Sequence, residues 1–421
     1  MMRWAAWFAW LTPAIAAAAE PVLINQIAVS PAAPDVLYAA GRPIGVLKSL
    51  DRGRTWTPAR RGLQNPSAYH LALHPTDPDV LYVGTFGGGV SRSGDGAGTW
   101  AAVNSGLGNT NIHALAIDPA NPRRLIASTS TGEVFQTLDE GTTWAPYGEG
   151  LPAYDGEVLS SLFFRAGLLS LGQGAVFERE ARAPAWRAAG PDLAAKAVSA
   201  LAVDAGGALL VGTRYGGLYR EASGNRGWSP VGAEFRQDWI RTIVADPRRS
   251  GRLMVSVLGR GLFGSRDAGR SWHRLETGLP PNDDLETVVA DPRDPDRLYA
   301  GTHHHGLYAS TDGGRSWRPP EGIVYESVEE VIASLDRAGE SPPSARRPAP
   351  PAAFAKCNQC HGWIDPVLNG KATYWRVAAN RRNWVPTVAR MARGAGLTPA
   401  EQREVIEFLE RSTGSTPKKN P

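Results

Sequence analysis

Thr137-Leu138-Asp139-Glu140-Gly141-Thr142-Thr143-Trp144 is the stretch from which the fold of this 421-residue chain can be read. It follows the pattern Ser/Thr-x-Asp-x-Gly-x-Ser/Thr-Trp, in which the copy ending at Trp100 has Ala97 in place of the glycine. The other copies of the pattern are Ser49–Trp56, Ser93–Trp100, Ser265–Trp272 and Ser310–Trp317. A motif that recurs with this regularity predicts an internally repeated architecture.

Two degenerate copies, ending at Trp186 and Trp228, fill the gap between the third and fourth complete motifs. Their aspartate positions hold Ala181 and Ser223. With these copies included, seven tryptophans follow one another at intervals of 44, 44, 42, 42, 44 and 45 residues. The chain therefore contains seven repeats of nearly equal length.

Each repeat has the pattern of four short strands separated by Pro-, Gly- and Asp-rich turns. In the third repeat, the predicted strands are Ile112–Ile117, Leu125–Ser128, Glu133–Gln136 and a last strand opening at Trp144. Four-stranded units of 40–45 residues are typical of β-propellers. We expect a mainly β chain with a seven-bladed β-propeller over residues 20–322. No spare strand is evident to close the ring, and Pro319-Pro320 should weaken the last strand.

The motif resembles the Asp-box, or BNR repeat, of sialidases, sortilin-type receptors and photosystem II assembly factors related to Ycf48. The resemblance implies that the box aspartates and tryptophans are structural, not catalytic. These aspartates are Asp51, Asp95, Asp139, Asp267 and Asp312. Sialidases also need an arginine triad, which is missing from the first repeat because Arg42 lies in a hairpin. A sialidase activity is therefore not expected.

Loops joining the second and third strands of each repeat should meet on one face, together with the starts of the innermost strands. The residues expected there are Arg42, Phe86, Gln173, Arg214, Tyr215, Arg260, His303, His304 and His305 from the loops, and Tyr69, His113, Arg241 and Glu286 from the strands. The positive and aromatic character suits an anionic or planar ligand. The histidine run is read either as a metal site or as a solvated hairpin tip whose side chains diverge.

The N-terminus has the features of a secretory signal. Arg3 precedes an apolar run from Trp4 to Ala16, and small residues lead up to Glu20. This pattern predicts a signal peptide over residues 1–19, cleaved after Ala19. The expected product is periplasmic, with no membrane span after cleavage and no nucleic-acid partner.

Cys357-Asn358-Gln359-Cys360-His361 contains the only two cysteines of the chain. The C-x-x-C-H spacing is typical of c-type haem attachment, with a thioether from each cysteine and His361 as an iron ligand. A redox-active thiol pair or half of a zinc site are the alternatives. No βαβ pattern accompanies the first, and no further Cys or His follows for the second. We expect one covalent haem c.

The segment around this motif resembles a small class I cytochrome c with helices. Residues 323–353 are predicted as a helix followed by a Pro-rich linker, 354–413 as the haem domain and 414–421 as a disordered tail. Met391 is the only methionine after His361 and is the expected second axial ligand, with core filling as its alternative. Trp384 is predicted to pack on the haem edge or simply in the core.

Together these features predict a periplasmic electron carrier whose propeller serves as a docking or binding scaffold. The alternative is a propeller-based oxidoreductase that oxidises a small substrate and passes electrons to the haem. From Phe354 onward, eleven basic and five acidic residues give a net charge of +6. This excess favours an acidic redox protein as partner.

Overall fold

The computed structural model describes residues 22–152, 161–165, 168–173, 175–180, 183–189, 193, 197–222, 227–249, 251–275, 277–281 and 283–323. The predicted signal peptide, haem domain and tail lie outside the described residues, and so does the predicted helix and linker except for Ile323, which lies in a strand. The same holds for the site residues Cys357, Cys360, His361, Trp384 and Met391, so their assignments stay predictions.

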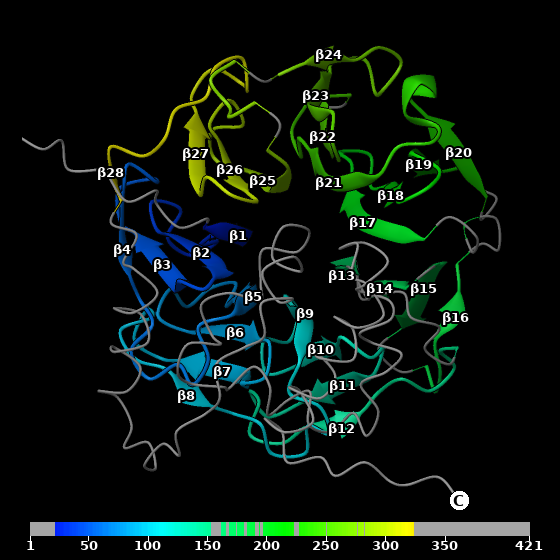
Figure 1. Ribbon diagram of the computed structural model, residues 1–421. Coiled ribbons are helices and arrows are strands. Elements are labelled where there is room, and N and C mark those ends of the chain that lie inside the picture. Colours follow the sequence, from blue (N-terminus) through cyan, green and yellow to red (C-terminus); the bar gives the residue numbers. More distant parts are fainter. Residues whose placement is uncertain are drawn as a thin grey trace, which may run out of the picture.

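The described part of the chain is almost entirely β and forms a β-propeller (Figure 1). Its strands lie in seven sheets, one for each repeat. In order along the chain, the sheets are β1 (Leu23–Val29), β2 (Leu37–Arg42), β3 (Gly45–Ser49) and β4 (Thr55–Pro58) with β28 (Gly322–Ile323); β5 (Ala68–Leu73), β6 (Leu81–Thr85), β7 (Gly89–Ser93) and β8 (Ala101–Ala102); β9 (Ile112–Ile117), β10 (Leu125–Thr129), β11 (Val134–Thr137) and β12 (Ala145–Pro146); β13 (Ser161–Arg165), β14 (Leu168–Gln173), β15 (Ala175–Glu180) and β16 (Arg187–Ala188); β17 (Val198–Val203), β18 (Leu209–Thr213), β19 (Leu218–Glu221) and β20 (Trp228–Val231); β21 (Ile240–Ala245), β22 (Leu253–Val257), β23 (Gly261–Ser265) and β24 (His273–Arg274); and β25 (Leu285–Ala290), β26 (Leu298–Thr302) and β27 (Leu307–Ser310).

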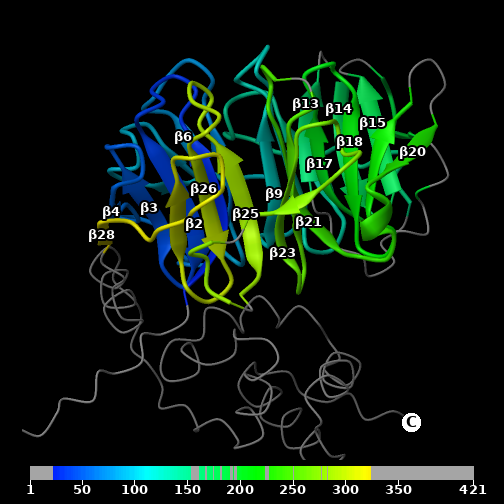
Figure 2. The same ribbon diagram turned by 90° about the horizontal axis from the view of Figure 1, so that it is seen from above.

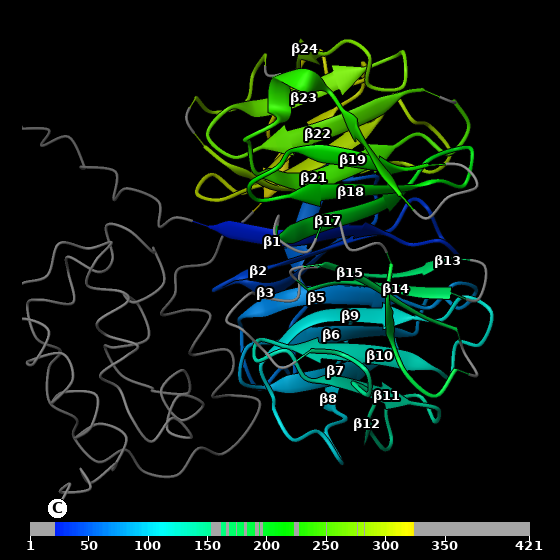
Figure 3. The same ribbon diagram turned by 90° about the vertical axis from the view of Figure 1, so that its right-hand side faces the viewer.

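Within each sheet, consecutive strands pair antiparallel, from the first strand at the centre of the ring to the last at its rim. Side views show the sheets packed against their neighbours around a common axis (Figures 2 and 3). Apolar clusters fill the spaces between adjacent sheets; one of them combines Tyr82 and Val90 of the second sheet with Ile112 and Phe135 of the third. The core is thus distributed around the ring.

A closing strand is present, so the expectation that none would be found is wrong. β28 pairs in parallel with β4, aligning Gly322 with Thr55 and Ile323 with Trp56. The Glu321 amide also donates to the Arg54 carbonyl at 2.9 Å. The closing strand has only two residues, Gly322 and Ile323, and follows Pro319-Pro320. A strand of two residues is too short to show an alternating pattern, so it could not be predicted from the sequence. The chain end of the propeller is thereby fastened to its first sheet.

The expected weakness of the last sheet is confirmed. In the described part of the chain this sheet has three strands, and a fourth is represented only by a single bridge between Ala309 and Arg318. Proline has no N–H with which to continue the ladder, so Pro319-Pro320 ends the pairing at Arg318.

The Asp-boxes are structural turns. In the third repeat, one oxygen of Asp139 accepts hydrogen bonds from the Thr137 hydroxyl at 2.7 Å and the Thr143 amide at 2.8 Å, and the other accepts from the Thr143 hydroxyl at 2.7 Å. These hydrogen bonds lower the pKa of Asp139 to about 2. Because Asp139 is held ionised by the turn, it is not available as an acid catalyst.

Five of the seven tryptophans of the repeats, Trp100, Trp144, Trp186, Trp228 and Trp317, donate a hydrogen bond to the preceding repeat. The Trp144 ring is 5% exposed, and its N–H donates to the Val103 carbonyl of the second repeat at 2.8 Å. Trp186 donates in the same way to the Tyr147 carbonyl at 2.7 Å, and Trp228 to the Ala189 carbonyl at 3.0 Å. The two repeats that lack the box aspartate therefore keep the contact between neighbouring sheets.

Candidate binding site at the propeller axis

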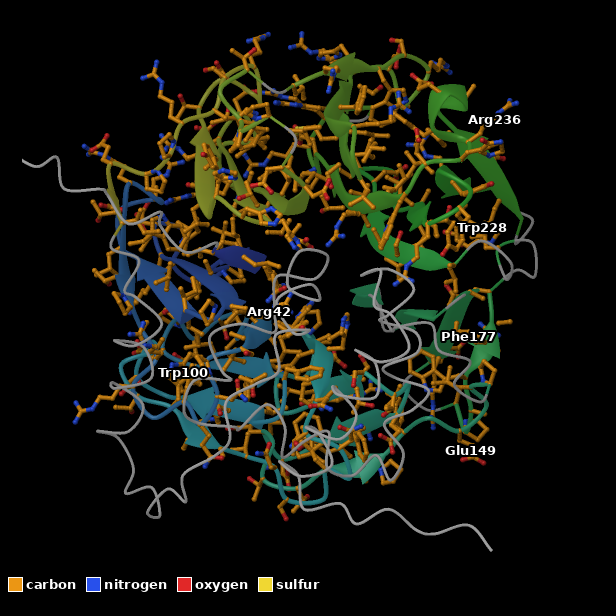
Figure 4. The ribbon with its side chains drawn as sticks, viewed as in Figure 1. Arg42, Trp100, Glu149, Phe177, Trp228 and Arg236 are labelled. Carbon is orange, nitrogen blue, oxygen red and sulfur yellow. The ribbon has the colours of Figure 1, made fainter. Side chains whose placement is uncertain are left out.

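The predicted convergence of hairpins and innermost strands is confirmed on one side of the axis. Arg42, at the end of β2, stacks its guanidinium 4.8 Å from the centre of the Tyr69 ring on β5. Tyr69 lies 5.8 Å from Phe86 and 5.5 Å from His113, measured between ring centres. Figure 4 shows Arg42 close to the centre of the ring. Side chains from the first three sheets thus form one continuous surface.

The other side of the axis is built around Trp239, which comes directly before β21. The Arg214 guanidinium lies 4.8 Å from the Trp239 ring centre, and the Arg241 guanidinium lies 5.3 Å from it. Guanidinium groups stack well on aromatic faces. Trp239 thereby gathers two cations from different sheets beside the axis.

Glu286, near the start of β25, bridges a cation and an imidazole. One carboxylate oxygen pairs with Arg241, and the other lies 2.5 Å from Nδ1 of His303. The Glu286 side chain is only 9% exposed, whereas His303 is 30% exposed. A nearly buried carboxylate is stabilised by such paired contacts. Glu286 therefore holds Arg241 and His303 in place.

The three adjacent histidines do not share a ligand position. His303 turns to Glu286, whereas His304 and His305 place Nδ1 at 3.0 Å and 2.7 Å from the two carboxylate oxygens of Asp283. Among the residues that the structure describes, no three or more His, Cys, Asp or Glu side chains form a group able to hold a metal ion. Only His303 therefore diverges from the run, while His304 and His305 share Asp283 as their partner.

The charges of the site influence one another. Burial lowers the pKa of Arg241; the negative charge of Asp284 opposes this shift, and the positive charges of Arg214 and Arg42 add to it. Burial likewise lowers the pKa of His303, with Arg241 and Arg42 adding to the effect. Because its pKa is lowered, His303 is neutral at neutral pH.

Two other predicted residues, Tyr215 and Arg260, contribute less. Tyr215 is 65% exposed, and Arg260 pairs with Asp238 and stacks on Phe263 at 5.2 Å. Gln173 ends β14, but its side chain is outside the described structure.

The sequence reading missed Trp239, Asp283 and Asp284. Asp284 accepts a hydrogen bond from the Gly259 amide at 2.9 Å and, through its carbonyl, one from the His303 amide at 2.9 Å. All three residues come immediately before the first strand of a sheet. That shared position was the available signal, because residues just before an inner strand lie at the same face as the hairpins.

A second concave region lies on the opposite face, where the Asp-boxes are. It has a volume of about 460 Å³ between the sixth and seventh sheets. Its lining residues are Arg249, Arg252, Arg266, Asp296, Thr311, Asp312 and Arg315. Here Asp296 pairs with Arg252 at 2.7 Å and with Arg249 at 3.4 Å. These contacts with Asp296 neutralise part of the positive charge of the cluster.

Comparisons with known proteins support the fold. The GH74 enzyme of Niastella koreensis has a TM-score of 0.59 and 16% identity, and the match covers 71% of this chain and 54% of that one. YCF48 from Cyanidioschyzon merolae has a TM-score of 0.55 and 16% identity, over 70% of this chain and 96% of that one. A structure of YCF48 bound to D1 peptide has a TM-score of 0.56 and 13% identity, over 69% and 94%. No protein-family model and no curated protein matches the sequence.

These similarities define a mainly β protein with a β-propeller resembling those of GH74 enzymes and YCF48. The match spans about half the length of the GH74 enzymes, at 54% and 46% for two of them. Identities this low establish the fold alone, because one fold carries many functions. In the described ranges, no helix has the length and apolarity needed to cross a membrane.

Proposed function

We propose that the chain is an exported monohaem c-type cytochrome, with its seven sheets forming one seven-bladed ring that serves as a docking scaffold. The observation that carries the proposal is the run Cys357-Asn358-Gln359-Cys360-His361. The secretory signal over residues 1–19 supports it, because c-type haem is attached outside the cytoplasm.

The donor set of the C-terminal segment fits a haem iron. Cys357 and Cys360 would hold the porphyrin by thioethers, His361 would ligate the iron, and Met391 offers a thioether for the opposite side. The haem would supply a one-electron redox centre. A neutral thioether ligand raises the reduction potential relative to stronger donors, so the residues of this segment suit an electron carrier. Trp384 would pack on the haem edge.

A scaffold role for the propeller is supported by its carboxylates, which are already engaged in hydrogen bonds and ion pairs. The box aspartates are committed to their turns, and Glu286 and Asp283 are paired with cationic or imidazole groups. Glycoside hydrolysis needs two carboxyl groups placed around a scissile bond, so likeness to GH74 enzymes gives little reason to expect that activity. YCF48 with its bound D1 peptide shows that a similar fold holds a polypeptide. The +6 charge of residues 354–421 favours an acidic redox protein as partner.

A propeller-based oxidoreductase is the second candidate. The cations and aromatic rings at the axis favour it, because they form a place where a small substrate could be held near a redox centre. Cofactor analysis of the purified protein distinguishes the two. Haem alone supports the carrier, whereas a second redox cofactor supports the enzyme.

Covalent attachment is tested by denaturing electrophoresis followed by haem staining. The unmodified protein should give a stained band, and the Cys357→Ala/Cys360→Ala variant should not. A stained band from that double variant would overturn the assignment. Met391→Ala should in addition lower the reduction potential and open the iron to carbon monoxide; rapid carbon monoxide binding by the unmodified protein, unchanged in this variant, would contradict the carrier role.

A further inference from the structure

The cavity of about 460 Å³ on the box face is lined in part by variable positions of two Asp-boxes. Arg266 occupies the first variable position of the box in the sixth sheet, and Thr311 and Arg315 occupy the first and last variable positions in the seventh. All three residues are exposed and line the cavity. The first variable position is uncharged in the other complete boxes, where it holds Leu50, Gly94 and Leu138. The cationic lining is therefore particular to these two neighbouring sheets.

The wall between the two sheets is balanced in charge. Asp296, which comes before β26, lies 2.7 Å from Arg252 and 3.4 Å from Arg249, both of which come before β22. Arg252 also lies 3.7 Å from Asp246. Two guanidinium groups thus face two carboxylates, and their charges offset one another.

Arg266 and Arg315 lie outside this balance. Among the described residues, neither has a carboxylate within ion-pair distance; Arg315 donates only to the Asp312 carbonyl, at 3.4 Å. The Asp312 carboxylate accepts from the hydroxyls of Ser310 at 2.8 Å and Ser316 at 2.6 Å, inside its own turn. With Asp246 included, four arginines and three aspartates give the cavity a net charge of +1.

We propose that this cavity binds a small phosphate ester that also carries hydroxyl groups, as a sugar phosphate does. The guanidinium fork matches the oxygens of phosphate, and two guanidinium groups match the charge of a phosphate monoester, about −1.5 to −2 at pH 7. The Thr311 hydroxyl and the Asp296 carboxylate, which is 44% exposed, can bind the hydroxyl groups of the ligand.

The size of the cavity favours an ester over free phosphate. Its volume of about 460 Å³ lies within the range of small-molecule sites, about 300–1,000 Å³. A bare phosphate would use the two guanidinium groups and leave Asp296 without a ligand contact. The site goes beyond the proposed electron-transfer function and does not depend on the haem.

Calorimetric titration of the full-length protein at low ionic strength tests the proposal, with glucose 6-phosphate, inorganic phosphate and glucose as separate probes. Glucose 6-phosphate should bind with one-to-one stoichiometry and more tightly than either of the others. Arg266→Gln and Arg315→Gln should each weaken its binding about tenfold, the factor that corresponds to one hydrogen bond with a charged group. Absence of binding at millimolar glucose 6-phosphate would overturn the proposal, as would equally tight binding of inorganic phosphate.

Arg270→Gln is the matched control. Arg270 is exposed and belongs to the same box turn as Arg266, but the described lining of the cavity does not include it. Both substitutions remove one charge, so an effect of net charge alone would weaken binding equally in the two variants. Equal weakening would contradict the assignment. Binding unchanged in both Arg266→Gln and Arg315→Gln would place the ester elsewhere on the protein and would also contradict it. An unchanged circular dichroism spectrum separates loss of the site from loss of the fold.

Discussion

Gly84 on β6 lies close against Ile112 of the third sheet, and replacing it with alanine should destabilise the propeller. A Cβ atom at this position would lie 2.5 Å from Cγ2 and 3.0 Å from Cβ of Ile112, which is completely buried. Overpacking of this kind costs about 1–3 kcal/mol. The lower entropy of the unfolded alanine chain offsets about 0.4–1 kcal/mol of that cost. We therefore expect Gly84→Ala to lower the free energy of unfolding by about 1–2 kcal/mol.

Urea unfolding followed by tryptophan fluorescence measures this change, and a double-mutant cycle identifies its cause. Ile112→Ala alone should cost about 2–5 kcal/mol through the cavity it leaves. In the Gly84→Ala background its cost should fall by about 1–2 kcal/mol, because the new methyl group no longer meets Ile112. Gly108→Ala is the control, since its Cβ would lie 3.6 Å from Phe135 in ordinary contact. Additive costs, or equal stability of the Gly84 and Gly108 variants, would refute the steric argument.

Two further predictions concern the repeats. Trp144→Phe leaves the Val103 carbonyl without its donor and should lower the free energy of unfolding by about 1–3 kcal/mol. Trp228→Phe should lower it by less, because the Trp228 side chain is less buried. A larger effect at Trp228 than at Trp144 would contradict this prediction. Hydrogen bonds led by the Thr99 amide lower the pKa of Asp95 from 3.8 to about 2, so the stability that Asp95 contributes should be complete above pH 3.8 and be lost as the pH falls towards 2. Unfolding measured across that range should depend less on pH in Asp95→Asn than in the unmodified protein, and identical profiles would contradict the prediction.

The close approach of Gly84 to Ile112 of the next sheet corresponds to a recurring sequence feature, which strand periodicity did not reveal. Gly212 and Gly301 occupy the same place on β18 and β26, and their Cβ atoms would lie 2.8 Å from Ile240 and 2.5 Å from Ile24 of the next sheet. Each of these glycines is followed by a threonine. The recurring Gly-Thr pair therefore marks the contact between sheets, whereas the Asp-box marks the turn on the opposite face.

Most of the fold could be predicted because its local determinants repeat. The tryptophan spacing and the four-strand pattern predicted a β-propeller, and the turn chemistry of the boxes appears in the structure as expected for Asp139. The closing strand could not be predicted, because β28 has only two residues and its partner Thr55–Trp56 lies more than 260 residues away in the chain. A pairing set by ring closure depends on the whole fold and leaves no periodic pattern in its own sequence.

At the axial site, alignment of the repeats predicted which residues lie on the same face of the propeller, but not which residues they contact. Aligning the repeats correctly placed Arg42, Tyr69, Arg241 and Glu286 at one face, since equivalent positions of a propeller share the same height along the axis. The alignment could not show which neighbours each side chain would choose. The partners of the histidine run, above all Asp283, come from the loop before β25, and their geometry separates His303 from His304 and His305.

The contrast between the two faces follows from the same repeat. On the box face each aspartate is used within its own turn, and arginines such as Arg252 pair with nearby aspartates such as Asp296. On the hairpin face no turn motif recurs from sheet to sheet. Equivalent positions of different sheets therefore carry different residue types there. The candidate site at the axis is built from different residues in different sheets, with cations stacked on aromatic rings and one nearly buried glutamate. It therefore lies on the hairpin face. Substitutions at Arg42 should for the same reason alter the candidate site without disturbing the turns that hold the ring.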